Sequence, residues 1–103
     1  MIEVTFTYDL RPNINKDKYI ELVKRATAMM LMADGFIEFR AHRNMLGSPH
    51  VRRTSVWDSL SHWAEFAQKP DFQDINSEFP FFVINLDVQI WGPSPITPET
   101  IKP

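Results

Sequence analysis

Every second residue between Ile2 and Tyr8 is apolar, and the residues that separate them are glutamate or threonine. A period of two is typical of a β-strand that buries one face. Three further stretches, 36–45, 50–57 and 81–91, also have strand-like patterns, and in the last one apolar residues occupy the even positions. The pattern therefore predicts β-strands in all of these segments.

Apolar residues recur at intervals of three or four between Tyr19 and Ala33, which is typical of an amphipathic helix. Asn15 is a suitable N-cap for this helix, and Gly35 favours the left-handed conformation just past its end. A second helix is predicted after Ser59. Pro70 marks the start of another helical turn before the last strand.

The order strand, helix, strand, strand, helix, strand predicts a ferredoxin-like α+β fold, βαββαβ, with a four-stranded antiparallel sheet. Both helices then cover one face of the sheet. Several strands carry bulky residues on both faces, so a homodimer in which two sheets face each other is expected. Residues 1–91 form this domain, and the proline-rich tail 92–103 is either an arm over the neighbouring subunit or a disordered end.

The composition indicates a single domain with a partner surface and argues against nucleic-acid binding. The chain has 103 residues, which suits one domain, and it is 44% hydrophobic and 13% aromatic. That apolar content exceeds what a small domain comfortably buries, which again indicates a partner surface. A net charge of −2 gives no electrostatic footprint for nucleic acid.

Cysteine is absent, which excludes disulfides, a thiolate nucleophile and a zinc–cysteine site. The histidines fall on different predicted elements without paired spacing, so no metal site is expected. No apolar run approaches the length of a membrane span, and the first residues lack the pattern of a signal peptide. A cytoplasmic protein without membrane association is the expectation.

An unusual amount of aromatic surface gathers where the third strand enters the second helix. Trp57, Trp63, Phe66 and Phe72 all lie on this corner. So many large rings at one place pack a core, line a cavity, or do both.

This corner, together with the order of the elements, resembles the antibiotic biosynthesis monooxygenase family of dimeric α/β barrels. The resemblance covers residues 1–91 and rests on the tripeptides Asp34–Phe36, Trp57–Ser59 and Pro70–Phe72. It implies a homodimer whose two sheets enclose a barrel, with a cavity between the sheet and the helices of each subunit. Enzymes of this family include cofactor-free oxygenases of aromatic polyketides, quinol monooxygenases and haem-degrading oxygenases.

The resemblance carries over residue by residue. Oxygenases of the polyketide type use an asparagine on the third strand, a tryptophan at its end and a tyrosine in the second helix. Trp57 matches the tryptophan, whereas Arg53 stands at the asparagine position and Trp63 at the tyrosine position. Haem-degrading members use a tryptophan and an iron-binding histidine where this chain has Phe66 and Asn76, so haem is disfavoured and no cofactor is implied.

Three residues are candidates for catalysis. Arg53 is suited to stabilise a phenolate by charge and hydrogen bonding, and Trp57 to stack on a ring and donate its indole N–H. His42 is the candidate base or hydrogen-bond partner. Each has a structural alternative: Trp57 packs the corner, Arg53 pairs with Glu38 or Asp87, and His42 is an ordinary surface histidine.

The candidate substrate-binding residues are Trp63, Phe66 and Phe72, as the walls of a pocket, and Arg40. Arg40 shares a strand face with His42 and adds positive potential there. The three aromatic residues lie at helical spacing, which suits a hydrophobic core equally well.

The sequence is thus consistent with several functions, and whether the chain is an enzyme stays open. The first hypothesis is a cofactor-independent monooxygenase that acts with dioxygen on a phenolic, quinol or polycyclic aromatic small molecule. The second is a non-catalytic dimeric barrel that binds a small apolar ligand. The third is an isomerase or lyase of the same fold, in which His42 shuttles a proton.

Overall fold

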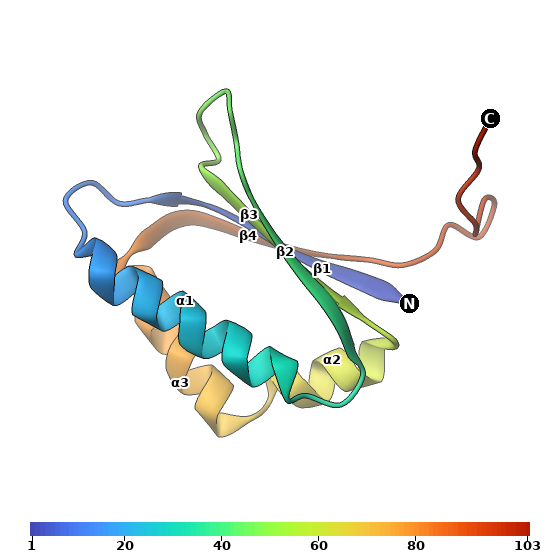
Figure 1. The fold of residues 1–103 in the computed structure, drawn as a ribbon, viewed down its shortest axis with the longest axis horizontal. Coiled ribbons are helices and arrows are strands. Elements are labelled where there is room, and N and C mark those ends of the chain that lie inside the picture. The colour runs from blue at the N-terminus through green and yellow to red at the C-terminus, as the bar shows by residue number, and fades with distance from the viewer.

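The computed structural model describes residues 1–103 and shows a twisted sheet with all its helices on one side (Figure 1). In chain order the elements are β1 (Ile2–Leu10), α1 (Lys16–Leu31), β2 (Phe36–Arg43), β3 (Val51–Trp57), α2 (Leu60–Ala67), α3 (Pro70–Glu78), the 3₁₀ helix η1 (Phe79–Phe81) and β4 (Val83–Trp91). The sheet has four strands in the order β2-β3-β1-β4, and all neighbours are antiparallel. The predicted ferredoxin-like α+β fold is confirmed.

The helices begin where the sequence predicts. The Asn15 side chain accepts a hydrogen bond from the backbone N–H of Lys18 at 3.1 Å, and the Ser59 hydroxyl accepts one from the backbone N–H of His62 at 3.2 Å. Each bond satisfies an N–H that the first turn of a helix leaves without a partner. The helical turn predicted at Pro70 extends to Glu78 as a helix of its own.

Gly35 fixes the corner at which β3 enters α2. Its φ of +80° is a conformation that side chains disfavour, and a Cβ built on it would lie 2.4 Å from Nδ1 of His62. The Gly35 carbonyl accepts a hydrogen bond from the backbone N–H of Asp58 at 2.8 Å. The start of β2 is therefore held against the turn that follows Trp57.

The last strand differs from the sequence prediction in two ways. It begins at Val83, because the preceding Phe79–Phe81 segment forms a 3₁₀ helix. A bulge opposite Tyr8 then interrupts the alternation, and Asn85 takes a positive φ of 57°. The bulge places Ile84 on the open face of the sheet, whereas Leu86 and the later even-numbered residues point to the side of the helices.

The sheet face away from the helices is mostly polar, which differs from the expectation of bulky residues on both faces. Arg40 forms ion pairs with Glu3 and Glu38, each at 2.6 Å. Both glutamates pair with Val56 across the ladders, so the cluster lies over Val56, which is buried. The long Arg40 side chain thus covers part of the open face.

Exposed apolar side chains gather along β4 instead. Leu86, Val88 and Ile90 are 45–47% exposed, and Trp91 is 56% exposed. Because β4 is an edge strand, these side chains adjoin a row of unpaired backbone groups.

Residues 92–103 contain no helix or strand, and all of them are exposed. In Figure 1 this segment, drawn in red, extends away from the sheet and the helices. None of the helices combines the length and the apolar character that crossing a membrane requires.

Candidate functional site

The aromatic corner forms the centre of the hydrophobic core. Trp57 is fully buried, and its ring contacts those of Phe36, Trp63 and Phe66 at centroid distances of 5.1–5.6 Å. Its indole N–H donates to the Ser55 hydroxyl at 2.9 Å. The donor that was a candidate for substrate contact is therefore already engaged within the protein.

A cavity of about 30 Å³ lies between the sheet and the helices, beside this core. Three polar residues line it, namely Arg53, Ser55 and Asn76. Its apolar lining consists of Val4, Phe6, Ala26, Met30, Phe39, Trp63, Phe72 and Phe79. Of the candidate site residues, Arg53, Trp63 and Phe72 thus line the cavity, whereas Trp57 and Phe66 pack behind it.

Arg53 reaches the cavity from β3, whose helix-facing side it shares with Ser55 and Trp57. Its guanidinium donates to the Thr27 hydroxyl at 3.1 Å and lies 4.6 Å from the centroid of the Phe39 ring. Arg53 forms no ion pair, so its charge is not offset by Glu38 or by any other carboxylate. It is a partly buried cation in a largely apolar wall.

Two phenols that the sequence analysis did not single out adjoin Arg53. The hydroxyls of Tyr8 and Tyr19 are hydrogen-bonded to each other, and Tyr8 is fully buried. Burial, followed by the hydrogen bond to Tyr19, raises the pKa of Tyr8 above its ordinary value, and the nearby Arg53 opposes this shift only in part. Tyr8 therefore stays protonated and is not a base.

His42 and Arg40 lie on the other face of the sheet from the cavity. Ala41 pairs with Arg53 in the β2–β3 ladder, and so its neighbours on β2 point to the opposite side. Arg40 is engaged by two glutamates. His42 is exposed and lines a polar hollow of about 400 Å³ together with Arg52. The structure therefore separates these two candidates from Arg53, Trp63 and Phe72.

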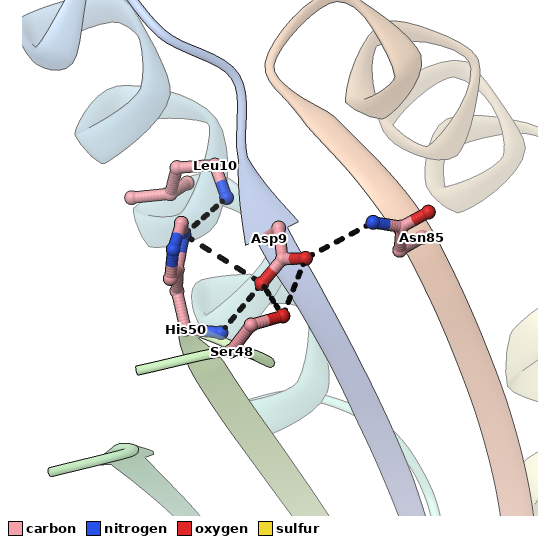
Figure 2. Close-up of polar contacts among 5 residues, drawn as sticks. All are labelled: Asp9, Leu10, Ser48, His50 and Asn85. Carbon is pink, nitrogen blue, oxygen red and sulfur yellow. Dashed lines mark hydrogen bonds and ion pairs between the residues drawn. The ribbon is translucent and has the colours of Figure 1, made fainter. Parts of the chain in front are cut away.

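A buried carboxylate, Asp9, forms a second polar cluster that the sequence analysis missed (Figure 2). It accepts hydrogen bonds from the Ser48 hydroxyl at 2.8 Å, the backbone N–H of His50 at 2.9 Å and the side-chain amide of Asn85 at 3.0 Å. The donors Asn85 and Ser48, in that order, hold the pKa of Asp9 below its ordinary value. This cluster ties β1 to the β2–β3 connection and to the bulge of β4.

The Asp9 cluster does not have the geometry of a nucleophilic triad. The Ser48 hydroxyl points at the carboxylate, whereas a triad needs it at the histidine (Figure 2). Nδ1 of His50 accepts from the backbone N–H of Leu10 at 3.0 Å, so the neutral ring carries its proton on Nε2. The arrangement is that of a structural tether.

The remaining histidine, His62, pairs with Asp58 at 2.6 Å on the surface of α2. Hydrogen bonding to Asp58 raises the pKa of His62 and lowers that of Asp58. No group of three or more histidine, cysteine, aspartate and glutamate side chains is placed to hold a metal ion. The cavity with Arg53 is therefore the candidate site.

Several solved structures share the fold at low sequence identity. SnoaB, a cofactor-independent oxygenase from Streptomyces nogalater, aligns with a TM-score of 0.77 and 11% identity over 95% of this chain and 97% of that one. A candidate antibiotic biosynthesis monooxygenase from Deinococcus radiodurans aligns with a TM-score of 0.78 and 17% identity over 99% and 97% of the two chains. A conserved protein from Methanosarcina mazei Go1 aligns with a TM-score of 0.77 and 13% identity over 87% and 89%. At these identities the likeness shows the fold alone.

A search among curated proteins finds no match to this chain. The family model described as antibiotic biosynthesis monooxygenase matches residues 1–78, which include β1 to β3 and all of the α-helices. The chain belongs to the antibiotic biosynthesis monooxygenase family.

Proposed function

We propose that this chain is a cofactor-independent monooxygenase that acts on a phenolic, quinol or polycyclic aromatic small molecule. The observation that carries the proposal is Arg53, a cation without a carboxylate partner in the wall of an apolar cavity. A fixed positive charge at such a place stabilises a developing anion, because little water screens it. Membership of the family and the fold shared with the oxygenase SnoaB support the same class of reaction.

The substrate itself supplies the electrons in this reaction. A ring methylene, as in an anthrone, loses a proton, and the resulting anion gives one electron to dioxygen. The substrate radical and superoxide then combine to form a carbon–oxygen bond, and the resulting peroxide anion takes up a proton from water. The hydroperoxide breaks its oxygen–oxygen bond and loses water, so the methylene becomes a carbonyl and the second oxygen atom leaves as water.

The cavity provides a positive charge and a largely apolar lining, but no general base. Neither histidine nor a carboxylate lines it, and His42 is on the other face of the sheet. We infer that the bound substrate loses its proton to water, and that Arg53 stabilises the negative charge as it passes to dioxygen. The reaction then speeds up as the pH approaches the pKa of the bound substrate.

The test is oxygen uptake by the purified protein with a panel of anthrones and hydroquinones in the presence of a metal chelator. We expect uptake above the rate without protein, and a product that carries one atom from ¹⁸O₂. Uptake that equals the background for every substrate contradicts the proposal.

One observation favours a second candidate function, a non-catalytic barrel that binds a small apolar ligand: eight of the eleven residues that line the cavity are apolar. In this case aromatic ligands raise the melting temperature without being converted. The geometry gives no support to an isomerase or lyase that depends on His42, since His42 does not reach the cavity.

We also propose that the protein is a homodimer. The half-exposed apolar side chains of β4 support a dimer, because an exposed apolar edge strand is prone to aggregation unless another chain packs on it. A second copy of the chain that packs along Ile90 and Trp91 buries this end of β4.

A further inference from the structure

A second, larger space adjoins the cavity on its outer side. It is a groove of about 370 Å³ between the end of α3 and the edge strand β4. Its apolar lining consists of Phe6, Phe79, Val83, Ile84, Leu86 and Val88. The bulge of β4 contributes to this groove, because beyond it Val83 joins Leu86 and Val88 on the side of the helices.

Three side chains are common to the groove and the inner cavity. Phe6, Asn76 and Phe79 line both spaces, and we call these three residues the partition. Asn76 is the polar member of this partition, and its carboxamide is able both to donate and to accept a hydrogen bond. The two spaces are therefore neighbours.

The sizes of the two spaces suit different molecules. The inner cavity has about 30 Å³, and a cavity needs roughly 10–15 Å³ to hold one water molecule, so it suits a molecule of two atoms and excludes an aromatic ring. The groove of about 370 Å³ falls within the range of roughly 300–1,000 Å³ that is usual for ligand pockets. Only the groove has room for a ring system.

We propose that the inner cavity is the binding site for dioxygen and that the groove holds the aromatic ring, with Phe6, Asn76 and Phe79 between them. This assignment rests on the proposed oxygenase function. The largely apolar walls of the inner cavity favour dioxygen over water, because water loses hydrogen bonds there. The carboxamide of Asn76 hydrogen-bonds to an oxygen substituent of the ring and holds the ring in the groove.

The assignment gives Arg53 a defined role. When the substrate anion passes one electron to dioxygen, the negative charge moves from the ring in the groove to superoxide in the inner cavity. Arg53 lines that cavity, and its positive charge therefore stabilises the superoxide anion. The substrate radical and superoxide then combine at the partition, which conserves the electrons and the atoms of both.

The dioxygen site is tested by methyl NMR of the protein under pressurised oxygen, with nitrogen as the reference gas. Met30 lines the cavity, whereas Leu22 is also buried in the core but does not line it. We expect paramagnetic relaxation several times larger at the Met30 methyl than at those of Leu22. The substitution Ala26→Val, which fills the cavity, should abolish the difference, while the exposed Ala28→Val on the same helix should preserve it. Equal relaxation at Met30 and Leu22 in the wild type overturns the assignment.

The ring site is tested by the affinity for 1-naphthol, measured without oxygen. Loss of one hydrogen bond in Asn76→Ala should weaken binding about fivefold, whereas Gln73→Ala on the exposed side of α3 should leave it unchanged. Ala26→Val should leave naphthol binding unchanged too, because the ring stays outside the inner cavity. Naphthol binding that is lost in Ala26→Val overturns the assignment, as does binding that is unaffected by Asn76→Ala.

Both measurements are independent of turnover. Oxygen relaxation at Met30 together with naphthol binding, but without oxygen uptake, refutes the proposed function and leaves the two sites in place. Oxygen uptake without relaxation at Met30 refutes the dioxygen site and leaves the proposed function in place.

Discussion

At the scale of single residues, Trp57 and Arg53 have different roles although they share one strand face. Trp57 is fully buried and its N–H is engaged by Ser55, so it supports the cavity from behind. Arg53 lines the cavity and has no carboxylate partner. The chemistry is therefore expected to depend on Arg53, and the folding stability on Trp57.

Replacement of Trp57 by phenylalanine should test this division. Trp57→Phe removes the hydrogen bond to Ser55 and leaves a void in the core, so it should lower the free energy of unfolding by roughly 1–3 kcal/mol. Phe81→Leu is the control, because Phe81 is 75% exposed and should change little. Denaturant unfolding of both variants measures the difference, and equal effects would show that Trp57 is not a core residue.

At the scale of elements, residues far apart in sequence hold the ends of the strands together. Asp9 on β1 binds the amide of Asn85, 76 positions away, and Gly35 binds the backbone of Asp58 after β3. Each of these contacts fixes the place of a strand relative to its neighbour, and both are sensitive to single substitutions.

The depressed pKa of Asp9 predicts a dependence of stability on acid. The ionised form of Asp9 is more stable in the folded protein than in the unfolded chain. This stabilisation is present above the unfolded pKa and is lost as the pH falls through the folded pKa. We expect Asp9→Asn to lower the urea midpoint near neutral pH, and the gap to the wild type to narrow between about pH 5 and pH 2.

The matched control is Asp87→Asn, since Asp87 is exposed on the neighbouring strand β4. It should change the urea midpoint little at any pH. A gap between Asp9→Asn and the wild type that stays constant down to the lowest pH would contradict the tether described for Asp9.

Gly35 makes a second prediction at this scale. A Cβ at this position meets both a positive φ and the imidazole of His62, so Gly35→Ala should destabilise the fold by at least about 1–2 kcal/mol. Gly92→Ala is the control, because no heavy atom lies within 4 Å of its added Cβ. Thermal unfolding compares the two variants, and equal melting temperatures would refute the steric argument.

Local pattern predicted the elements well and their mutual placement less well. The alternation from Ile2 to Tyr8 predicted β1. The same period of two, applied to the predicted strand 36–45, placed Arg40 and His42 on one face. It did not show that this face is opposite to that of Arg53, because the pairing of Ala41 with Arg53 depends on the register between two strands.

The bulge of β4 and the missed polar contacts have the same kind of cause. The alternation of β4 breaks at Asn85, where the side chain binds Asp9 from the far end of β1. The hydrogen bond between Tyr8 and Tyr19 also joins two elements. No local pattern encodes such partners, although Tyr8 on an apolar strand face and Tyr19 on an apolar helix face indicated that both phenols approach the core.

At the scale of the whole molecule, the edge strand β4 has a neighbouring strand on one side only. Its exposed apolar side chains predict a homodimer with twice the mass of the 12.1 kDa chain in sedimentation equilibrium at micromolar concentration. Ile90→Asp should shift the equilibrium toward the monomer, because a charge at an apolar interface loses its hydration. Ile20→Asp is the matched control, because Ile20 is 44% exposed on α1 and lies outside β4. A wild-type protein that sediments as a monomer would contradict this prediction.

The most direct test of the central claim is the turnover number for oxygen uptake with an anthrone, compared between Arg53→Gln and Arg52→Gln. The two arginines are adjacent on β3, but Arg53 lines the cavity and Arg52 lies on the open face. We expect Arg53→Gln to lower kcat by about 100-fold, as for other groups that stabilise a transient anion, and Arg52→Gln to leave it unchanged. Equal turnover by both variants and the wild type would contradict the claim that Arg53 stabilises the anion formed during the reaction.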